Sequence, residues 1–116
     1  MNTFWDFLDQ LLSNGHLVVD RPRGSHHPHY PEIVYPLDYG YLDGTRSGDG
    51  GGIDVWIGTS TDHHLSDLLL TVDMQKQDAE IKLLLGCTED EIQTILDFHN
   101  QSSMRAILVH RPKEKK

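Results

Sequence analysis

The sequence predicts an α+β fold, in which a small antiparallel, partly closed β-barrel lies beside an N-terminal and a C-terminal helix. Two observations carry this prediction. Apolar residues recur at helical spacing near both ends of the chain, and several short β-rich segments lie between them. The chain shows no internal repeat, low-complexity run or linker, so residues 1–116 are expected to form a single domain.

Each expected helix has recognisable start and stop signals. Large apolar residues from Phe4 to Leu12 follow a helical period, with Thr3 as the N-cap and Asn14-Gly15 as the stop. Near the other end, Thr88-x-x-Glu91 forms a capping box ahead of an apolar helical pattern that runs to about residue 100. At this spacing His99 faces the core, so we expect a partly buried histidine there.

Short apolar runs bounded by turn residues indicate the strands. Two of them, separated by a three-residue turn, predict an antiparallel hairpin with Asp73 and Asp78 on either side of the turn. We expect strands at residues 16–20, 32–35 (brief), 53–58, 65–74, 78–86 and 104–109, with loops at 21–31 and 41–52.

Composition excludes several classes of protein. The formal net charge of −8 argues against a broad nucleic-acid-binding face, which would need a basic patch. No apolar segment approaches membrane-spanning length, and the acidic, amphipathic N-terminus lacks the features of a signal peptide. The single cysteine, Cys87, allows no internal disulfide. We therefore expect a reduced, cytoplasmic protein with no nucleic-acid or membrane partner.

Residues 35–58 contain the strongest functional signal. Four aspartates, Asp38, Asp43, Asp49 and Asp54, alternate there with a run of glycines that lets the backbone approach a ligand closely. Carboxylate oxygens on such a loop suit a hard cation such as Mg²⁺. If the hairpin turn of residues 73–78 folds toward this loop, its two aspartates join the same cluster.

The order and spacing of these residues resemble a known signature. Tyr35-Pro36-x-x-Tyr39-Gly40, then Gly44-Thr45, then Asp49-Gly50-x-x-x-Asp54-Val55 is similar to the motif of soluble family I inorganic pyrophosphatases. The resemblance implies a five-stranded, OB-like barrel with helices beside it. It also implies Mg²⁺ as cofactor and hydrolysis of inorganic pyrophosphate, or of a related small phosphoanhydride, by a metal-activated water.

The resemblance also assigns roles to single residues. It implies metal ligands at Asp49, Asp54 and Asp78, with assistance from Asp73, and a water-orienting role for Tyr39. Phosphate-binding residues are expected at Arg23, His29 and Lys82. Lys82 stands two residues beyond the family's phosphate-binding lysine, whose own position holds Glu80.

Other positions depart from the family pattern, and they motivate different functions. Gly51 replaces the acid that accepts a proton from the attacking water, while His99 and Asn100 replace a Tyr-Lys pair. One alternative is therefore a non-catalytic relative that binds a phosphorylated ligand or a protein partner. Another is a transition-metal site formed by the histidines of residues 26–29. The apolar N-terminal helix suits either packing on the core or contact with a second copy in a homo-oligomer.

Overall fold

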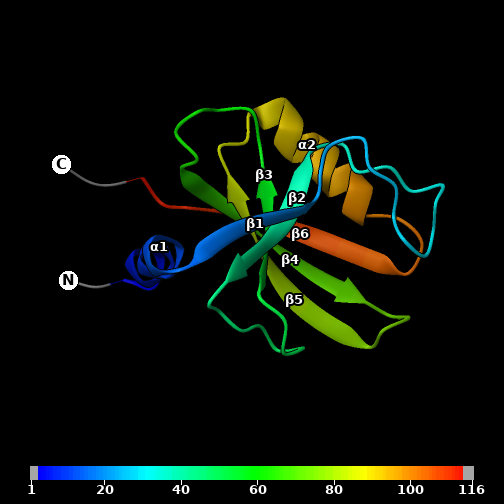
Figure 1. The fold of residues 1–116 in the computed structure, drawn as a ribbon, viewed down its shortest axis with the longest axis horizontal. Coiled ribbons are helices and arrows are strands. Elements are labelled where there is room, and N and C mark those ends of the chain that lie inside the picture. The colour runs from blue at the N-terminus through cyan, green and yellow to red at the C-terminus, as the bar shows by residue number, and fades with distance from the viewer. Residues whose placement is uncertain (1–2, 114–116) are drawn as a thin grey trace.

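The computed structural model describes residues 3–113 and has two helices and six strands arranged around one sheet (Figure 1). The α+β class is as predicted. The elements are α1 (Phe4–Asn14), β1 (His16–Arg21), β2 (Asp38–Asp43), β3 (Ile53–Ile57), β4 (Leu65–Asp73), β5 (Asp78–Leu85), α2 (Glu89–His99) and β6 (Met104–His110).

Both helices begin at the residues that the sequence indicates. The Thr3 hydroxyl accepts a hydrogen bond from the Asp6 N–H, and the Asp6 carboxylate accepts one from the Thr3 N–H. Thr88 and Glu91 form the same reciprocal pair at the start of α2. These bonds satisfy backbone donors that have no partner within the first helical turn. Neither helix of the described residues is long and apolar enough to cross a membrane.

The sheet corrects the predicted antiparallel barrel. Its order is β1-β2-β3-β5-β4-β6, so it has six strands instead of five, and β3 pairs with β5 in parallel. The edge strands β1 and β6 do not pair with each other within residues 3–113, and the sheet does not close. The predicted hairpin is confirmed, because β4 and β5 pair antiparallel with Asp73 opposite Asp78.

Strand β2 lies where the sequence predicted no strand, since residues 38–40 had no assignment and residues 41–43 were expected to begin a loop. Its residues, DYGYLD, include aspartates and a glycine, which are depleted in strands. Gly40 allows β2 to lie against β1, since a Cβ added there would come within 1.8 Å of the Val18 carbonyl oxygen. The brief strand expected at 32–35 is wrong: that segment makes a single bridge, between His26 and Val34.

Alternation along the strands divides the core between the two sheet faces. In β3, Val55 packs on the face covered by α1, and its neighbour Trp56 packs on the face covered by α2. In β5, Leu83 and Leu84 separate in the same way. The sheet therefore lies between two apolar clusters, one beneath each helix.

His99 belongs to the core beneath α2, as its helical position predicts. Its side chain is buried, and its Nε2 accepts a hydrogen bond of 3.0 Å from the Trp56 indole N–H. This bond requires the neutral imidazole with Nε2 unprotonated. Burial, assisted by the positive charge of Lys82, lowers the pKa of His99 to about 3.

Acid is therefore expected to destabilise the fold through His99. Between its folded pKa of about 3 and its unfolded pKa of ~6.5, the unfolded chain binds the extra proton. Stability consequently falls as the pH falls through this window, by about 2 kcal/mol from pH 7 to pH 5. Urea unfolding at the two pH values measures the loss. His99→Gln, which keeps an acceptor for Trp56 without titrating, should lose about 2 kcal/mol less than the wild type. Equal losses in both proteins would show that His99 does not contribute.

Candidate functional site

The candidate site is the polar continuation of the core beneath α2. On that sheet face, each strand carries apolar side chains near α2 and polar ones farther along. In β3, Asp54 lies two residues before Trp56, and in β5, Lys82 lies two residues before Leu84. Asp54 and Lys82 are direct partners in the parallel β3–β5 register. Strand alternation alone therefore places these charges side by side.

These side chains line a cavity of about 240 Å³. It is lined by Asp49, Asp54, Asp73 and Asp78, the four metal ligands that the resemblance implies, and they come from the loop before β3, from β3 and from the two ends of the β4–β5 turn. Asp38 and Asp43 of β2 are not among its lining residues. Lys82 and Tyr39 also line it, as predicted. The charged residues of its wall are Asp20, Asp49, Asp54, Asp73, Asp78 and Glu80, with Arg21, Lys76 and Lys82 as the basic ones.

Lys82 connects the groups at the base of the cavity. Its Nζ donates to the Tyr39 hydroxyl at 2.8 Å and to Asp54 Oδ2 at 2.8 Å, and it lies 3.3 Å from Glu80 Oε2. The Lys82 side chain is only 6% exposed, and those of Glu80 and Asp54 are 15% and 28% exposed. One ammonium group thus holds two carboxylates and a phenol in fixed positions.

The electrostatics of this group follow from its burial. Burial by itself would lower the pKa of Lys82, but its anionic surroundings and hydrogen bonds outweigh this and raise it, so Lys82 stays charged. Burial raises the pKa of Tyr39 far above its usual value, which keeps a neutral phenol. Burial also raises the pKa of Glu80, and the neighbouring Asp54 carboxylate acts in the same direction. A buried carboxyl group with a raised pKa, in a cavity, is typical of functional sites.

Asp49 is held by its own loop. Its Oδ1 accepts a 2.6 Å hydrogen bond from the Ser47 hydroxyl and one of 2.9 Å from the Gly51 N–H. These bonds, the first one foremost, hold the pKa of Asp49 below its usual range. The carboxylate is therefore ionised and fixed toward the cavity. Gly51 is exposed beside it, and a Cβ built there would meet Asp49 Oδ1 at 3.4 Å.

Asp73 has both a structural and a cavity-lining position. Its Oδ1 accepts hydrogen bonds from the backbone N–H groups of Gln75 and Lys76 and from the Ser103 hydroxyl. Burial raises the pKa of Asp73, but these bonds outweigh it and leave the pKa below its usual value. Oδ1 of Asp73 therefore stabilises the turn, as aspartates commonly do, while the same residue also lines the cavity.

Two predicted phosphate ligands lie outside the cavity wall. Arg23 and His29 are exposed, and neither is among the lining residues. Their loop instead places Arg21 and His27 against the cavity. Arg21 donates to the Tyr35 hydroxyl at 2.8 Å, and the His27 ring stacks on the Tyr35 ring with centroids 6.3 Å apart.

Sequence reasoning also left Glu80 without a role. The signal that would have found it is the period of two along β5, where Asp78, Glu80 and Lys82 share one face. Arg21 was harder to identify, because β1 ends there in an irregular register opposite β2 that no local pattern indicates.

His99 and Asn100, which stand at the end of α2 in place of the family's Tyr-Lys pair, bring no charge to the cavity. His99 is buried against Trp56, and the Asn100 side chain bonds backbone groups of Leu96 and Ala106. Arg111, which follows the other end of β6, pairs with Asp9 of α1 at 2.6 Å. These residues support the fold.

The histidine loop holds itself together through its imidazoles. His26 Nδ1 bonds the Pro31 carbonyl oxygen at 2.6 Å, and His27 Nδ1 accepts from the N–H groups of His29 and Tyr30. Within residues 3–113, no three His, Cys, Asp or Glu side chains are gathered closely enough to hold a metal ion by themselves. The geometry therefore gives no support to a transition-metal site in this loop.

The donor set of the cavity nevertheless fits Mg²⁺ in kind. Mg²⁺ retains several waters and is commonly held by one or two carboxylates together with substrate phosphates, so it does not need a compact protein cage. Asp49 and Asp78 are available to it from opposite sides of the wall, and Asp54 shares its charge with Lys82.

Comparisons with known proteins add no assignment. No protein-family model matches the chain, and a search of curated proteins finds no matching sequence. The functional argument therefore depends on the cavity, the side chains that line it and the motif of residues 35–55.

Removing the shared cation is expected to destabilise the protein. In Lys82→Met, the carboxylates of Asp54 and Glu80 lose their common partner, which should lower the free energy of unfolding by about 3 kcal/mol. Urea unfolding at pH 7 measures this. The double variant Lys82→Met/Glu80→Gln should recover part of the loss, since one buried charge is removed with the cation.

The matched control is Lys76→Met, because Lys76 is exposed in the β4–β5 turn. It should change stability by no more than about 0.5 kcal/mol. Equal effects of the two single substitutions would contradict a central role for Lys82.

Proposed function

We propose that this protein is a Mg²⁺-dependent hydrolase of inorganic pyrophosphate or of a related small phosphoanhydride. The observation that carries the proposal is the convergence of Asp49, Asp54, Asp73 and Asp78 on one cavity that also contains Lys82 and Tyr39. The resemblance of residues 35–55 to family I pyrophosphatases points to the same chemistry.

The charge of the cavity determines what it can accept. Six carboxylates face three basic side chains, so a phosphoanhydride, itself an anion, would be repelled from the wall as it stands. Divalent cations remove this barrier. Mg²⁺, when bound, neutralises phosphate charge and supplies a water of lowered pKa as nucleophile.

The side chains that line the cavity bind the cation and orient the water. Asp49 and Asp78 hold the cation from the loop and the hairpin, with Asp54 between them and Asp73 assisting. Tyr39, a neutral phenol held by Lys82, is suited to orient a water by hydrogen bonding.

Phosphate oxygens are held by basic groups of the wall. Arg21 contributes charge-assisted hydrogen bonds, together with Lys76 of the turn. Lys82 contributes its positive charge, since its three N–H donors are directed at Tyr39, Asp54 and Glu80. In this proposal Arg21 takes the role that the sequence gave to Arg23, because Arg21 is the arginine that lines the cavity.

The proposal extends to the finer description of the fold. The first five strands are arranged as β1-β2-β3-β5-β4, which supports an OB-like, pyrophosphatase-type sheet, since the OB-fold is a partly open Greek-key barrel. Strand β6 then lies beside β4, at the position where such a sheet would begin to close.

A second candidate is a non-catalytic relative that binds a phosphorylated ligand with its metal ions. Two observations favour it: Asp54 is already paired with Lys82, and Gly51 offers no side chain as a general base. Loss of one general base typically costs a factor of about 10² to 10⁴ in rate.

Phosphate release from pyrophosphate tests the proposed activity. Turnover is expected with Mg²⁺ and not with EDTA, and Asp54→Asn should reduce it about 100-fold or more, because a metal-facing carboxylate becomes neutral. The matched control is Asp97→Asn, an exposed position on α2 outside the cavity, which should retain full turnover. Turnover that survives EDTA or is unchanged in Asp54→Asn would refute the proposal.

Gly51→Asp separates the two candidates. The structure has room for this side chain, since a Cβ at position 51 meets Asp49 Oδ1 at an ordinary contact distance of 3.4 Å. If the site is a hydrolase lacking its base, the rate should rise about tenfold or more. If Mg²⁺ and pyrophosphate bind to both proteins, as measured by calorimetry, and neither turns over, the binding role is the correct one.

A further inference from the structure

The face of the sheet that carries α1 is only partly covered. Three strands form a lateral row in which Leu83, Leu68 and Val109 are neighbours, and this row packs in the cluster beneath α1. The next row along the same strands is Ile81, Leu70 and Ile107. It is equally apolar, yet Ile81 is 43% exposed and Ile107 is 63% exposed. Helix α1 therefore covers the row of Leu83 but leaves the row of Ile81 uncovered.

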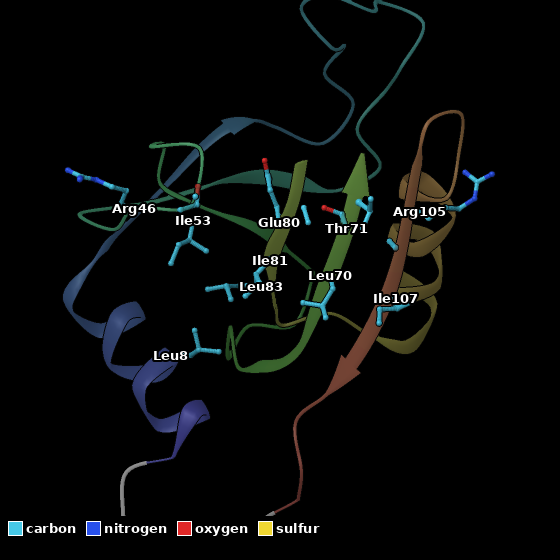
Figure 2. A pocket seen from close by; sticks show the side chains of 15 residues that line it. Leu8, Arg46, Ile53, Leu70, Thr71, Glu80, Ile81, Leu83, Arg105 and Ile107 are labelled. Carbon is cyan, nitrogen blue, oxygen red and sulfur yellow. The ribbon is translucent and has the colours of Figure 1, made fainter. Parts of the chain in front are cut away.

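The uncovered rows form the floor of a groove of about 690 Å³ (Figure 2). Leu8 of α1 lies at one side of it and Ile107 of β6 at the other. Beyond Ile81 and Leu70, one more row with Val72 at its centre belongs to the same floor. Neighbouring rows on one face are about 6.7 Å apart, so two rows occupy about 13 Å of the sheet. This width is comparable to the diameter of about 10–12 Å of one α-helix with its side chains.

Helix α1 has an apolar surface that is left exposed. Phe4 and Phe7 are 56% and 55% exposed, and Leu11 is 40% exposed. Their spacing of three and four residues places them on one stripe of the helix. Leu8, which lines the groove, belongs to the same helix and is one turn from Phe4 and Leu11, so the stripe begins close to the groove.

From these two adjoining surfaces we infer that a second copy of this chain occupies the groove, in a two-fold symmetric dimer in which each α1 lies on the partner's sheet. A two-fold interface pairs the same surface on both copies, so one molecule must present a helix and a complementary groove together. This chain does so. The two α1 helices would then form one layer between two sheets, and each would cover the rows that the partner's sheet leaves exposed.

Charge is consistent with this occupant. Helix α1 carries Asp6 and Asp9 and no Lys, Arg or His between residues 4 and 14. Asp9 is paired with Arg111 of its own chain, so the negative charge that α1 can offer to a partner is that of Asp6. The groove has Arg46 and Arg105 at its opposite rims (Figure 2). An acidic, apolar helix is therefore better matched to this groove than a basic one.

Sedimentation equilibrium of the purified protein, over a wide range of concentration, tests the inference. The wild type should be a dimer that dissociates on dilution. Phe7→Glu and Ile107→Lys should each weaken it about tenfold or more, because each places a charge in an apolar contact. Val34→Glu changes an exposed residue (46%) of the loop outside the groove and should leave the dimer intact. Circular dichroism of each variant verifies folding.

Mixing the two variants provides the sharper test. A Phe7→Glu chain and an Ile107→Lys chain should form a heterodimer, in which one contact is native and the other joins Glu to Lys. Neither variant should dimerise alone at that concentration. A wild type that is monomeric throughout, or a dimer that Ile107→Lys leaves unchanged, would overturn the inference. So would dimers in which Phe7→Glu is disruptive but mixing gives no heterodimer, since this indicates helix-to-helix contact alone.

Discussion

The burial of the Lys82 ammonium group is the constraint on which the candidate site depends. A charge at this depth is tolerable only with partners, and Tyr39, Asp54 and Glu80 supply them from three different strands. Those strands are β2, β3 and β5, so the same contact fixes the central strands relative to one another at the end of the sheet where α2 no longer covers it. The positions of the catalytic candidates thus follow from the need to satisfy one cation.

Strand alternation links this site to the apolar groove on the other face. In β5, the side chains of residues 78, 80 and 82 line the polar cavity, while Ile81 and Leu83 line the groove. Both features occur where the strands extend past the helices that cover them. The sheet is longer than either helix layer, and each face therefore exposes a different kind of surface: charged on one side, apolar on the other.

Local patterns in the sequence were sufficient for the helices and the hairpin, and the family resemblance named four aspartates that line one cavity. Capping boxes and periodicity are local signals, and the structure contains both boxes and the Asp73–Asp78 turn as predicted. Strand β2 was missed because its reason is not local: Gly40 is favourable there only because Val18 of β1 lies so close. Glu80 was left without a role although the period of two along β5 is a local signal, whereas the position of Arg21 depends on the irregular pairing of β1 with β2. The parallel β3–β5 pair, which joins Asp54 to Lys82, has no signature within either strand.

Both proposed functions require cations to bind in the cavity before a phosphate anion can enter it. With six carboxylates against three bases, the cavity repels phosphate anions whether or not it catalyses their hydrolysis. Cations must therefore enter first in either case. The functions diverge only afterwards, at the proton acceptor. Gly51 provides none, and Asp54 is held by Lys82 at 2.8 Å. Glu80, a partly buried carboxyl group, has a longer contact of 3.3 Å with Lys82 and a pKa raised by burial, so it is one candidate on the wall. In both proposals, cation binding therefore determines whether phosphate can bind in the cavity. The groups around Lys82 then determine whether the bound phosphoanhydride is hydrolysed.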